Sequence, residues 1–187
     1  MGTLCYTATV SLDGYAADAS GDFQWSAPGD EVFDFHVERM GAVSTEVLGR
    51  NTYLLMKYWE AEPEGETWSA AEHEFARRWQ ATERVVASSS LSSANLSADN
   101  TRLVPDLGLD ELARIVEESP GEVEIFGPTT ASPAIRAGMV TEFRFFVVPK
   151  IVGGGLSALP AGARLDMELV EQRVFGDGAV YLHYRPL

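Results

Sequence analysis

The stretch AGMVTEFRFFVVPKIVGGG, residues 137–155, decides the fold of this chain. Its centre, 143–148, is a strongly apolar run and predicts a β-strand that ends before Pro149. Apolar strands of this kind are typical of sheets that helices cover on both faces. The glycines at 153–155 predict a flexible turn, where the backbone either packs closely against a ligand or neighbouring chain or forms a bulge.

Strand-like and helix-like segments alternate on the N-terminal side of this stretch. We expect strands over residues 3–10, 43–48, 84–87 and 122–126. We expect helices over 30–41, from Gly49 through Met56, from the Ser69–Glu72 capping box to Gln80, from an Asp110 cap to Glu118, and from a Thr129 or Thr130 cap to Ala137. Segments 164–175 and 179–185 predict a closing hairpin across 176–178.

This order of elements predicts the fold class. Strands that alternate with helices and end in a hairpin favour a single α/β domain over residues 1–187. The sheet should be mostly parallel with an antiparallel C-terminal hairpin, and helices should cover both faces. Ligands of such sheets bind beyond the carboxyl ends of the strands.

Composition and charge restrict the function. Acidic residues outnumber basic ones 28 to 14, for a formal charge of −14, which disfavours nucleic-acid and membrane-surface partners. The N-terminus lacks the basic segment and long apolar core of a secretory signal, so we expect a cytoplasmic protein. Cys5 is expected to be a small buried residue. The three histidines show no metal-ligand spacing, so we expect no metal site.

Three expected strand-to-helix junctions carry residues suited to an anionic ligand. The first, Gly49-Arg50-Asn51-Thr52, combines a glycine with a guanidinium; an ordinary turn with a solvated arginine fits equally well. The second, Ser88-Ser89-Ser90, offers hydroxyl groups, although serine clusters are often simple loops. The third, Gly127-Pro128-Thr129-Thr130, places two hydroxyls at a helix start, where helix capping also explains them.

Taken together and in order, these segments resemble the dihydrofolate-reductase-like superfamily, and most of all the reductase domain of riboflavin-biosynthesis deaminase-reductases. The matching segments are Ser11-Leu12-Asp13-Gly14, GRNTY at 49–53, the serines at 88–90, Gly127, the stretch at 137–155 and VYLHYR at 180–185. The resemblance implies a dihydrofolate-reductase-like fold and NADPH-dependent hydride transfer to a small heterocyclic or conjugated carbonyl or imine substrate. A non-catalytic nucleotide- or ligand-binding protein on the same fold is the alternative.

The resemblance also implies roles for individual residues. Arg50, Ser88 and Ser89 would hold the 2′-phosphate of NADPH. Thr52 and the turn of Gly127, Pro128, Thr129 and Thr130 would hold the pyrophosphate, and Gly49 and Gly154 would allow close approach of the backbone. The segment 8–16, with Asp13, would flank the nicotinamide. The family pairs through its late strands, which implies a homodimer through the apolar strand at 143–148. The alternative is that this strand is central and buried within one subunit.

Two further features bear on substrate and turn geometry. The segment from Trp25 to Asp30 is similar to the element of dihydrofolate reductases whose acid faces the pterin, so Asp30 is a candidate catalytic residue. Helix capping is the alternative role for Asp30. The run 145–148 is apolar where dihydrofolate reductases carry a threonine, which argues against dihydrofolate. Gly127-Pro128 replaces a cis-linked Gly-Gly pair, so we expect a cis bond, with a trans proline in the first helical turn as the alternative.

Overall fold

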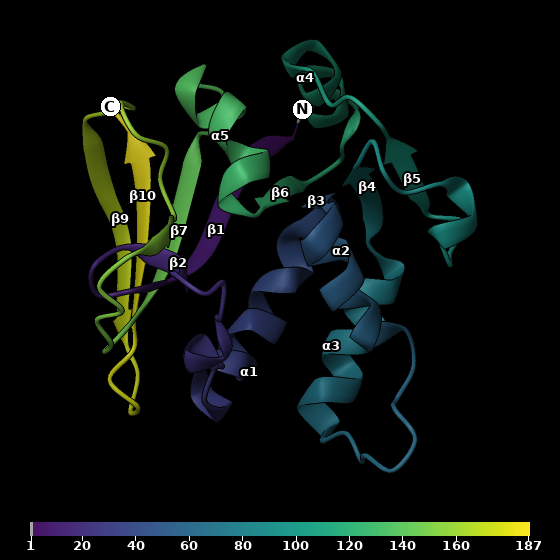
Figure 1. Ribbon diagram of the computed structural model, residues 1–187, viewed down its shortest axis with the longest axis horizontal. Coiled ribbons are helices and arrows are strands. Elements are labelled where there is room, and N and C mark those ends of the chain that lie inside the picture. The colour runs from purple at the N-terminus through teal and green to yellow at the C-terminus, as the bar shows by residue number, and fades with distance from the viewer. Residues whose placement is uncertain (1) are drawn as a thin grey trace.

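An eight-stranded sheet forms the centre of the protein, as the computed structural model of residues 2–187 shows (Figure 1). Its strand order is β5-β4-β3-β6-β1-β7-β10-β9. Neighbouring strands from β5 to β7 run parallel, and β10 pairs antiparallel with both β7 and β9. The strands are β1 (Thr3–Ser11), β3 (Val43–Gly49), β4 (Glu83–Ala87), β5 (Thr101–Val104), β6 (Glu122–Phe126), β7 (Glu142–Val148), β9 (Met167–Val174) and β10 (Val180–Pro186).

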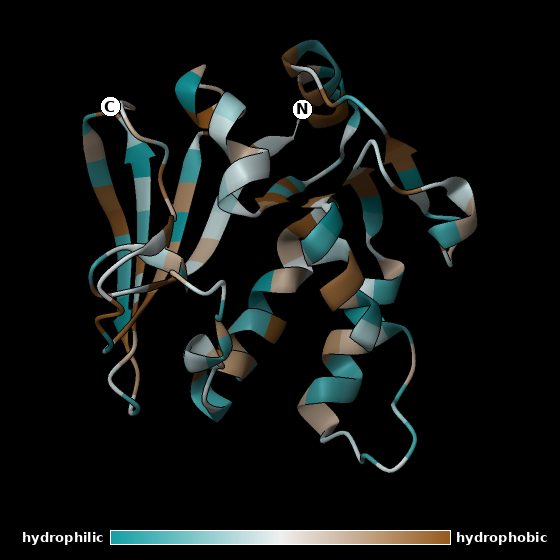
Figure 2. Ribbon diagram, in the orientation of Figure 1, coloured by the Kyte–Doolittle hydropathy of each residue, from teal (hydrophilic) through white to brown (hydrophobic). Residues whose placement is uncertain are grey.

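Helices cover both faces of this sheet. In Figure 1, α4 and α5 lie above the strands, whereas α1, α2 and α3 lie below them. The helices are α1 (Asp30–Arg39), α2 (Arg50–Met56), α3 (Ala70–Ala81), α4 (Leu109–Glu118) and α5 (Pro128–Arg136). Hydrophilic and hydrophobic segments alternate along α1 and α3, as expected for helices with one buried face (Figure 2). The expected α/β architecture is confirmed.

The two faces of the sheet differ in chemistry. The α4–α5 face is a dry core, in which Leu112 and Ile115 of α4 and Ile135 of α5 pack on strand side chains such as Val47 and Ile125. Alternate residues of the same strands point to the opposite face. There, Glu46 and Glu124 occupy neighbouring positions in the register of β3 and β6. The side toward α1 and α3 therefore combines apolar packing with buried charges.

Several element boundaries differ from the sequence-based expectation. The Ser69–Glu72 capping box is present, but Gly108 rather than Asp110 is the N-cap of α4. The expectation that Thr129 or Thr130 caps a helix is wrong, because Gly127 is the N-cap of α5. Asp30 likewise is the first residue of α1, after the N-cap Gly29, and makes no side-chain cap hydrogen bond.

Three strands were not expected from the sequence. β2 (Tyr15–Asp18) and β8 (Gly155–Ser157) pair with each other in a separate two-stranded sheet, and β5 forms one edge of the main sheet. Gly155 allows the β2–β8 approach, since a Cβ atom there would lie 2.1 Å from the carbonyl oxygen of Ala17. The glycine turn after β7 thus serves close packing of backbone on backbone.

The apolar strand β7 lies inside the sheet, between β1 and β10. Phe143 and Phe146 of β7 are buried in the core. Packing within one subunit therefore explains why this strand is apolar. The open edge on this side is β9.

Within residues 2–187, no helix is long and apolar enough to cross a membrane.

Candidate functional site

A cavity of about 650 Å³ lies where the carboxyl ends of β3, β4 and β6 meet. We call it the junction cavity, because strand-to-helix junctions supply much of its wall. Its other walls come from the β2–β8 sheet and from Phe23 and Leu55. The junction residues that line it are Gly49, Arg50, Asn51, Thr52, Ala87, Gly127, Pro128, Thr129 and Thr130. The structure therefore brings together most of the residues singled out for cofactor binding.

The two junctions approach each other so closely that no room is left for a side chain at position 49. A Cβ atom at Gly49 would lie 2.5 Å from Oγ1 of Thr130. Its φ of −71° is accessible to every residue, so space and not backbone conformation requires the glycine. Gly127, in contrast, has φ +86°, which favours glycine on conformational grounds. Both glycines leave the floor of the junction cavity open to a ligand.

The junction cavity offers donors for an anion. The α5 N-terminus has no side-chain cap, so its first-turn amides, apart from that missing at Pro128, stay available to a ligand. Arg50 is exposed at the cavity wall, and its guanidinium pairs with no carboxylate in the described part of the chain. The hydroxyls of Thr52 and Thr130 also line the cavity. These groups fit the phosphates of a dinucleotide.

The prediction of a cis peptide bond before Pro128 is wrong, because every peptide bond between residues 2 and 187 is trans. Pro128 instead occupies the first position of α5, where its fixed φ suits a helix and its missing N–H has no intrahelical acceptor. The positive φ of Gly127 produces the turn that the cis bond was expected to produce. Despite the trans bond, Gly127, Pro128, Thr129 and Thr130 all line the junction cavity.

Three of the residues expected to bind the cofactor, Ser88, Ser89 and Gly154, lie outside the junction cavity. The Oγ atom of Ser88 is buried and accepts hydrogen bonds from the amides of Ser90 and Leu91, and Ser89 is exposed beside it. Neither serine lines the junction cavity, although both follow Ala87, which does. Gly154 lies in the turn between β7 and β8 and is also absent from the cavity wall.

Asp13 supports that same turn. Its carboxylate accepts hydrogen bonds from the amides of Val152 and Gly153, at 3.1 and 2.8 Å. The hydroxyl of Ser11 and these amides hold the pKa of the Asp13 carboxyl below its ordinary value. Asp13 lines none of the cavities described here, and the structure assigns it a role in fixing the loop.

A second, outer cavity of about 1070 Å³ adjoins the junction cavity, and the two share Phe23 and Leu55. Asp30 lines it, as expected for a residue that faces substrate. Sequence reasoning missed the rest of its acidic and aromatic wall. Asp34 follows Asp30 by one helical turn, which was the available signal. Besides Phe23, the other charged and aromatic side chains of this wall are Phe33, Tyr58, Trp59 and Glu72.

A smaller inner cavity of about 210 Å³ lies between the sheet and α1. It shares Pro28, Phe33 and Met56 with the outer cavity, so the two adjoin. Glu46 and Glu124 supply its acidic groups. Burial, together with the nearby charge of Glu124, raises the pKa of Glu46 to about 8.

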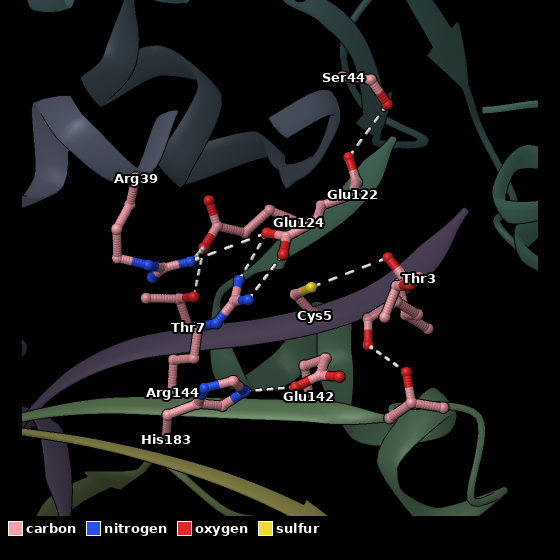
Figure 3. A network of polar contacts seen from close by, with 12 residues as sticks. Thr3, Cys5, Thr7, Arg39, Ser44, Glu122, Glu124, Glu142, Arg144 and His183 are labelled. Carbon is pink, nitrogen blue, oxygen red and sulfur yellow. Dashed lines mark hydrogen bonds and ion pairs between the residues drawn. The ribbon is translucent and has the colours of Figure 1, made fainter. Parts of the chain in front are cut away.

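A polar network continues from the inner cavity along the same face of the sheet (Figure 3). Thr7 donates to Glu124, and Arg144 donates two hydrogen bonds of 2.7 Å to the carboxylate of Glu122. Glu142 contacts His183. Cys5 is fully buried beside this network, which confirms that it is a small buried residue, and desolvation raises the pKa of its thiol.

The fold and the adjoining cavities define a dihydrofolate-reductase-like α/β protein. The sequence model of the RibD C-terminal domain family matches residues 3–181, and the chain belongs to this family. A candidate riboflavin biosynthesis protein from Shewanella sp. PV-4 has a similar structure, with a TM-score of 0.76, 21% identity and 99% coverage of both chains. A search of curated proteins finds no match.

Two further structures share the fold. Dihydrofolate reductase from Enterococcus faecalis, solved in complex with NADP(H), matches with a TM-score of 0.62, 14% identity, and 98% and 96% coverage of this chain and of that one. A diaminohydroxyphosphoribosylaminopyrimidine deaminase/5-amino-6-(5-phosphoribosylamino)uracil reductase from Thermotoga maritima matches with a TM-score of 0.66 and 16% identity. This chain is covered completely but spans only 57% of that bifunctional protein.

Proposed function

We propose that this chain is an NADPH-dependent reductase that acts on a small heterocyclic or conjugated carbonyl or imine substrate. One observation carries the proposal: the strand-to-helix junctions at 49–52 and 127–130 and the end of β4 line a single cavity, and this cavity adjoins a larger aromatic one. Arg50, at the first junction, pairs with no carboxylate in the described part of the chain. Membership of the RibD C-terminal domain family supports the same reaction class.

The residues of the two cavities have distinct roles in this proposal. Arg50 would hold a phosphate of the cofactor, while Thr52 and the first turn of α5 would hold its pyrophosphate. NADPH, when bound, supplies the hydride. The aromatic wall of the outer cavity would orient the substrate beside the cofactor, and Asp30 would hydrogen-bond to the substrate ring. Consumption of NADPH with a panel of carbonyl and imine heterocycles separates an enzyme from a non-catalytic binding protein.

Replacing Arg50 by alanine is expected to weaken NADPH binding much more than NADH binding. The guanidinium would lose a charged contact to the 2′-phosphate, which NADH lacks. Such a loss corresponds to roughly ten- to a hundredfold in affinity. Fluorescence titration of both cofactors into both proteins measures the effect. Equal weakening of the two cofactors would show that Arg50 contacts a group that they share.

We also propose a homodimer, formed through the late strands. The supporting observation is the open edge strand β9, on which Leu169, Val170 and Val174 are exposed. Large exposed apolar side chains on an open edge favour association. Light scattering at micromolar concentration is expected to give twice the chain mass of 20.4 kDa. A mass of one chain under these conditions rules the dimer out.

A further inference from the structure

A polar cavity of about 310 Å³ lies near the amino ends of the parallel strands, at the opposite end of the sheet from the junction cavity. We call it the amino-end cavity. Its wall comes from α1, the start of β6, and the strands β7, β9 and β10, and includes Phe35, Glu38, Arg39, Glu122, Arg144 and Tyr181. It shares no lining residue with the junction cavity or the outer cavity, so the proposed reductase site does not explain it.

The guanidinium of Arg39 lies at this cavity without a hydrogen bond. The Arg39 side chain is only 12% exposed. Its Nη2 atom lies 3.9 Å from the carboxylate of Glu122 and 3.8 Å from that of Glu124, which is too far for hydrogen bonds. It donates to no other residue in the described part of the chain. A mostly buried guanidinium with five unused N–H donors favours a ligand that carries acceptor oxygens.

Tyr181 of β10 provides an independent indication of a ligand. The residue is 1% exposed, lines the amino-end cavity, and forms no hydrogen bond through its hydroxyl within residues 2–187. Buried tyrosine hydroxyls normally have a partner. That of Tyr6, buried on the other face of the sheet, donates a hydrogen bond of 2.6 Å to the carbonyl of Ala158. The guanidinium of Arg39 lies 5.6 Å from the centroid of the Tyr181 ring, so both groups border the same space.

Arg144 adds to this surplus of donors. Its two terminal nitrogens donate to Glu122, but its Nε atom is buried and has no partner among the described residues. Figure 3 shows Arg39 and Arg144 on the same side of the sheet, beside Glu122. His183 also lines the cavity, but its imidazole contacts Glu142. The buried part of the amino-end cavity therefore holds more donors than its own acceptors satisfy.

The rim of the amino-end cavity has the opposite charge. Glu38 of α1 and Glu171 of β9 line the cavity and are exposed, and neither carboxylate pairs with a basic side chain within residues 2–187. A simple anion would meet these two charges, and the formal charge of −14, before it reached Arg39. A ligand that carries an ammonium group next to its carboxylate avoids this repulsion, because each of its charges meets a group of the opposite sign.

We propose that the amino-end cavity binds a small zwitterionic α-amino acid. The carboxylate of the ligand would accept hydrogen bonds from Arg39 and from the hydroxyl of Tyr181, and its ammonium group would lie between Glu38 and Glu171. The ring of Phe35 lies 4.8 Å from that of Tyr181 and offers apolar surface to an aliphatic side chain. This site goes beyond the proposed reductase function and does not depend on it.

Calorimetric titration of L-leucine into the intact protein tests the proposal. Two probes that each lack one charged group serve as comparisons: isocaproate has no ammonium group, and isoamylamine has no carboxylate. Leucine is expected to bind at one site per chain, and to bind at least about tenfold tighter than either comparison probe. Absence of leucine binding would overturn the proposal, and so would equal binding of either comparison probe.

Two variants locate the carboxylate of the ligand. Tyr181→Phe removes a hydroxyl that has no partner, so the variant should keep its urea unfolding midpoint while leucine affinity falls by about threefold or more. Arg39→Met should weaken leucine by about tenfold or more. Arg114→Met is the control, since it removes the same charge from an exposed site on α4, across the sheet, and should leave leucine affinity unchanged. Unchanged affinity in folded Tyr181→Phe, or an equal loss in the control, would contradict the proposal.

The rim and the cofactor provide two further readouts. In the double variant Glu38→Gln/Glu171→Gln, leucine should bind about threefold more weakly and isocaproate about threefold more tightly. An unchanged ratio of the two affinities would contradict the proposed ammonium site. Saturating NADPH should not displace leucine, because the two cavities share no lining residue. Displacement would place leucine in the junction cavity and overturn the proposal.

Discussion

Replacing Arg144 by methionine is expected to destabilise the protein by about 3–5 kcal/mol. Arg144 is 6% exposed, and it donates one hydrogen bond to each carboxylate oxygen of Glu122, a bidentate ion pair that Figure 3 shows. Without it, Glu122 keeps only the guanidinium of Arg39, at 3.9 Å. A partly buried carboxylate would then lose most of the charge that compensates its desolvation.

Urea unfolding of the variant and of the double variant Arg144→Met/Glu122→Leu measures this effect. The double variant is expected to recover most of the loss, because both charges are then absent. Arg114→Met is the matched control, since Arg114 pairs with Glu111 at an exposed position and should cost less than about 1 kcal/mol. A loss of less than about 1 kcal/mol in Arg144→Met itself would contradict this account.

Replacing Glu46 by glutamine is expected to stabilise the protein, increasingly so as pH rises. The folded protein holds the pKa of Glu46 at about 8, above its ordinary value of 4.5. Between these values the folded state keeps a proton that the unfolded chain has released. The free energy of unfolding of the natural protein therefore falls, by up to about 1.4 kcal/mol per pH unit. The stabilisation that the Glu46 proton provides is fully present below pH 4.5 and has been lost above pH 8.

Chemical unfolding of both proteins at several pH values checks this prediction. Glutamine is neutral throughout and can still accept the hydrogen bond from Trp79, so its advantage should grow from pH 4.5 to 8 and then level off. The comparison at acid pH is the internal control, because position 46 is then neutral in both proteins. An advantage independent of pH would show that Glu46 titrates normally in the folded state.

The sequence predicted most of the fold because its signals were local. The apolar run at 143–148, the capping box at Ser69 and the glycine turn at 176–178 each depend on neighbours in the chain. The strands β5 and β8 were missed, since four and three residues give too short a pattern and a pairing partner is needed to form them. Pro128 was misread, because sequence cannot show that Gly127 supplies the turn by a positive φ.

The sequence predicted the junction cavity better than the outer cavity. The junction cavity follows from topology, since glycines and threonines at the ends of parallel strands must meet at one edge of the sheet. The acidic and aromatic wall of the outer cavity comes from α1, the helix at 57–60 and α3, which only tertiary packing brings together. Glu46 lies in β3 next to Thr45, and its partner Trp79 is far along the chain, so the sequence gives no local sign of its burial.

The central claim is that the junction cavity holds NADPH, and titration of NADPH into the protein and its Gly49→Val variant tests it most directly. A side chain at position 49 would project toward Thr130 across the cavity floor, while the backbone of residue 49 tolerates valine. We expect saturable NADPH binding at one site per chain in the natural protein, and its loss in a variant with an unchanged circular dichroism spectrum. Equal NADPH affinity in the two folded proteins would contradict the account.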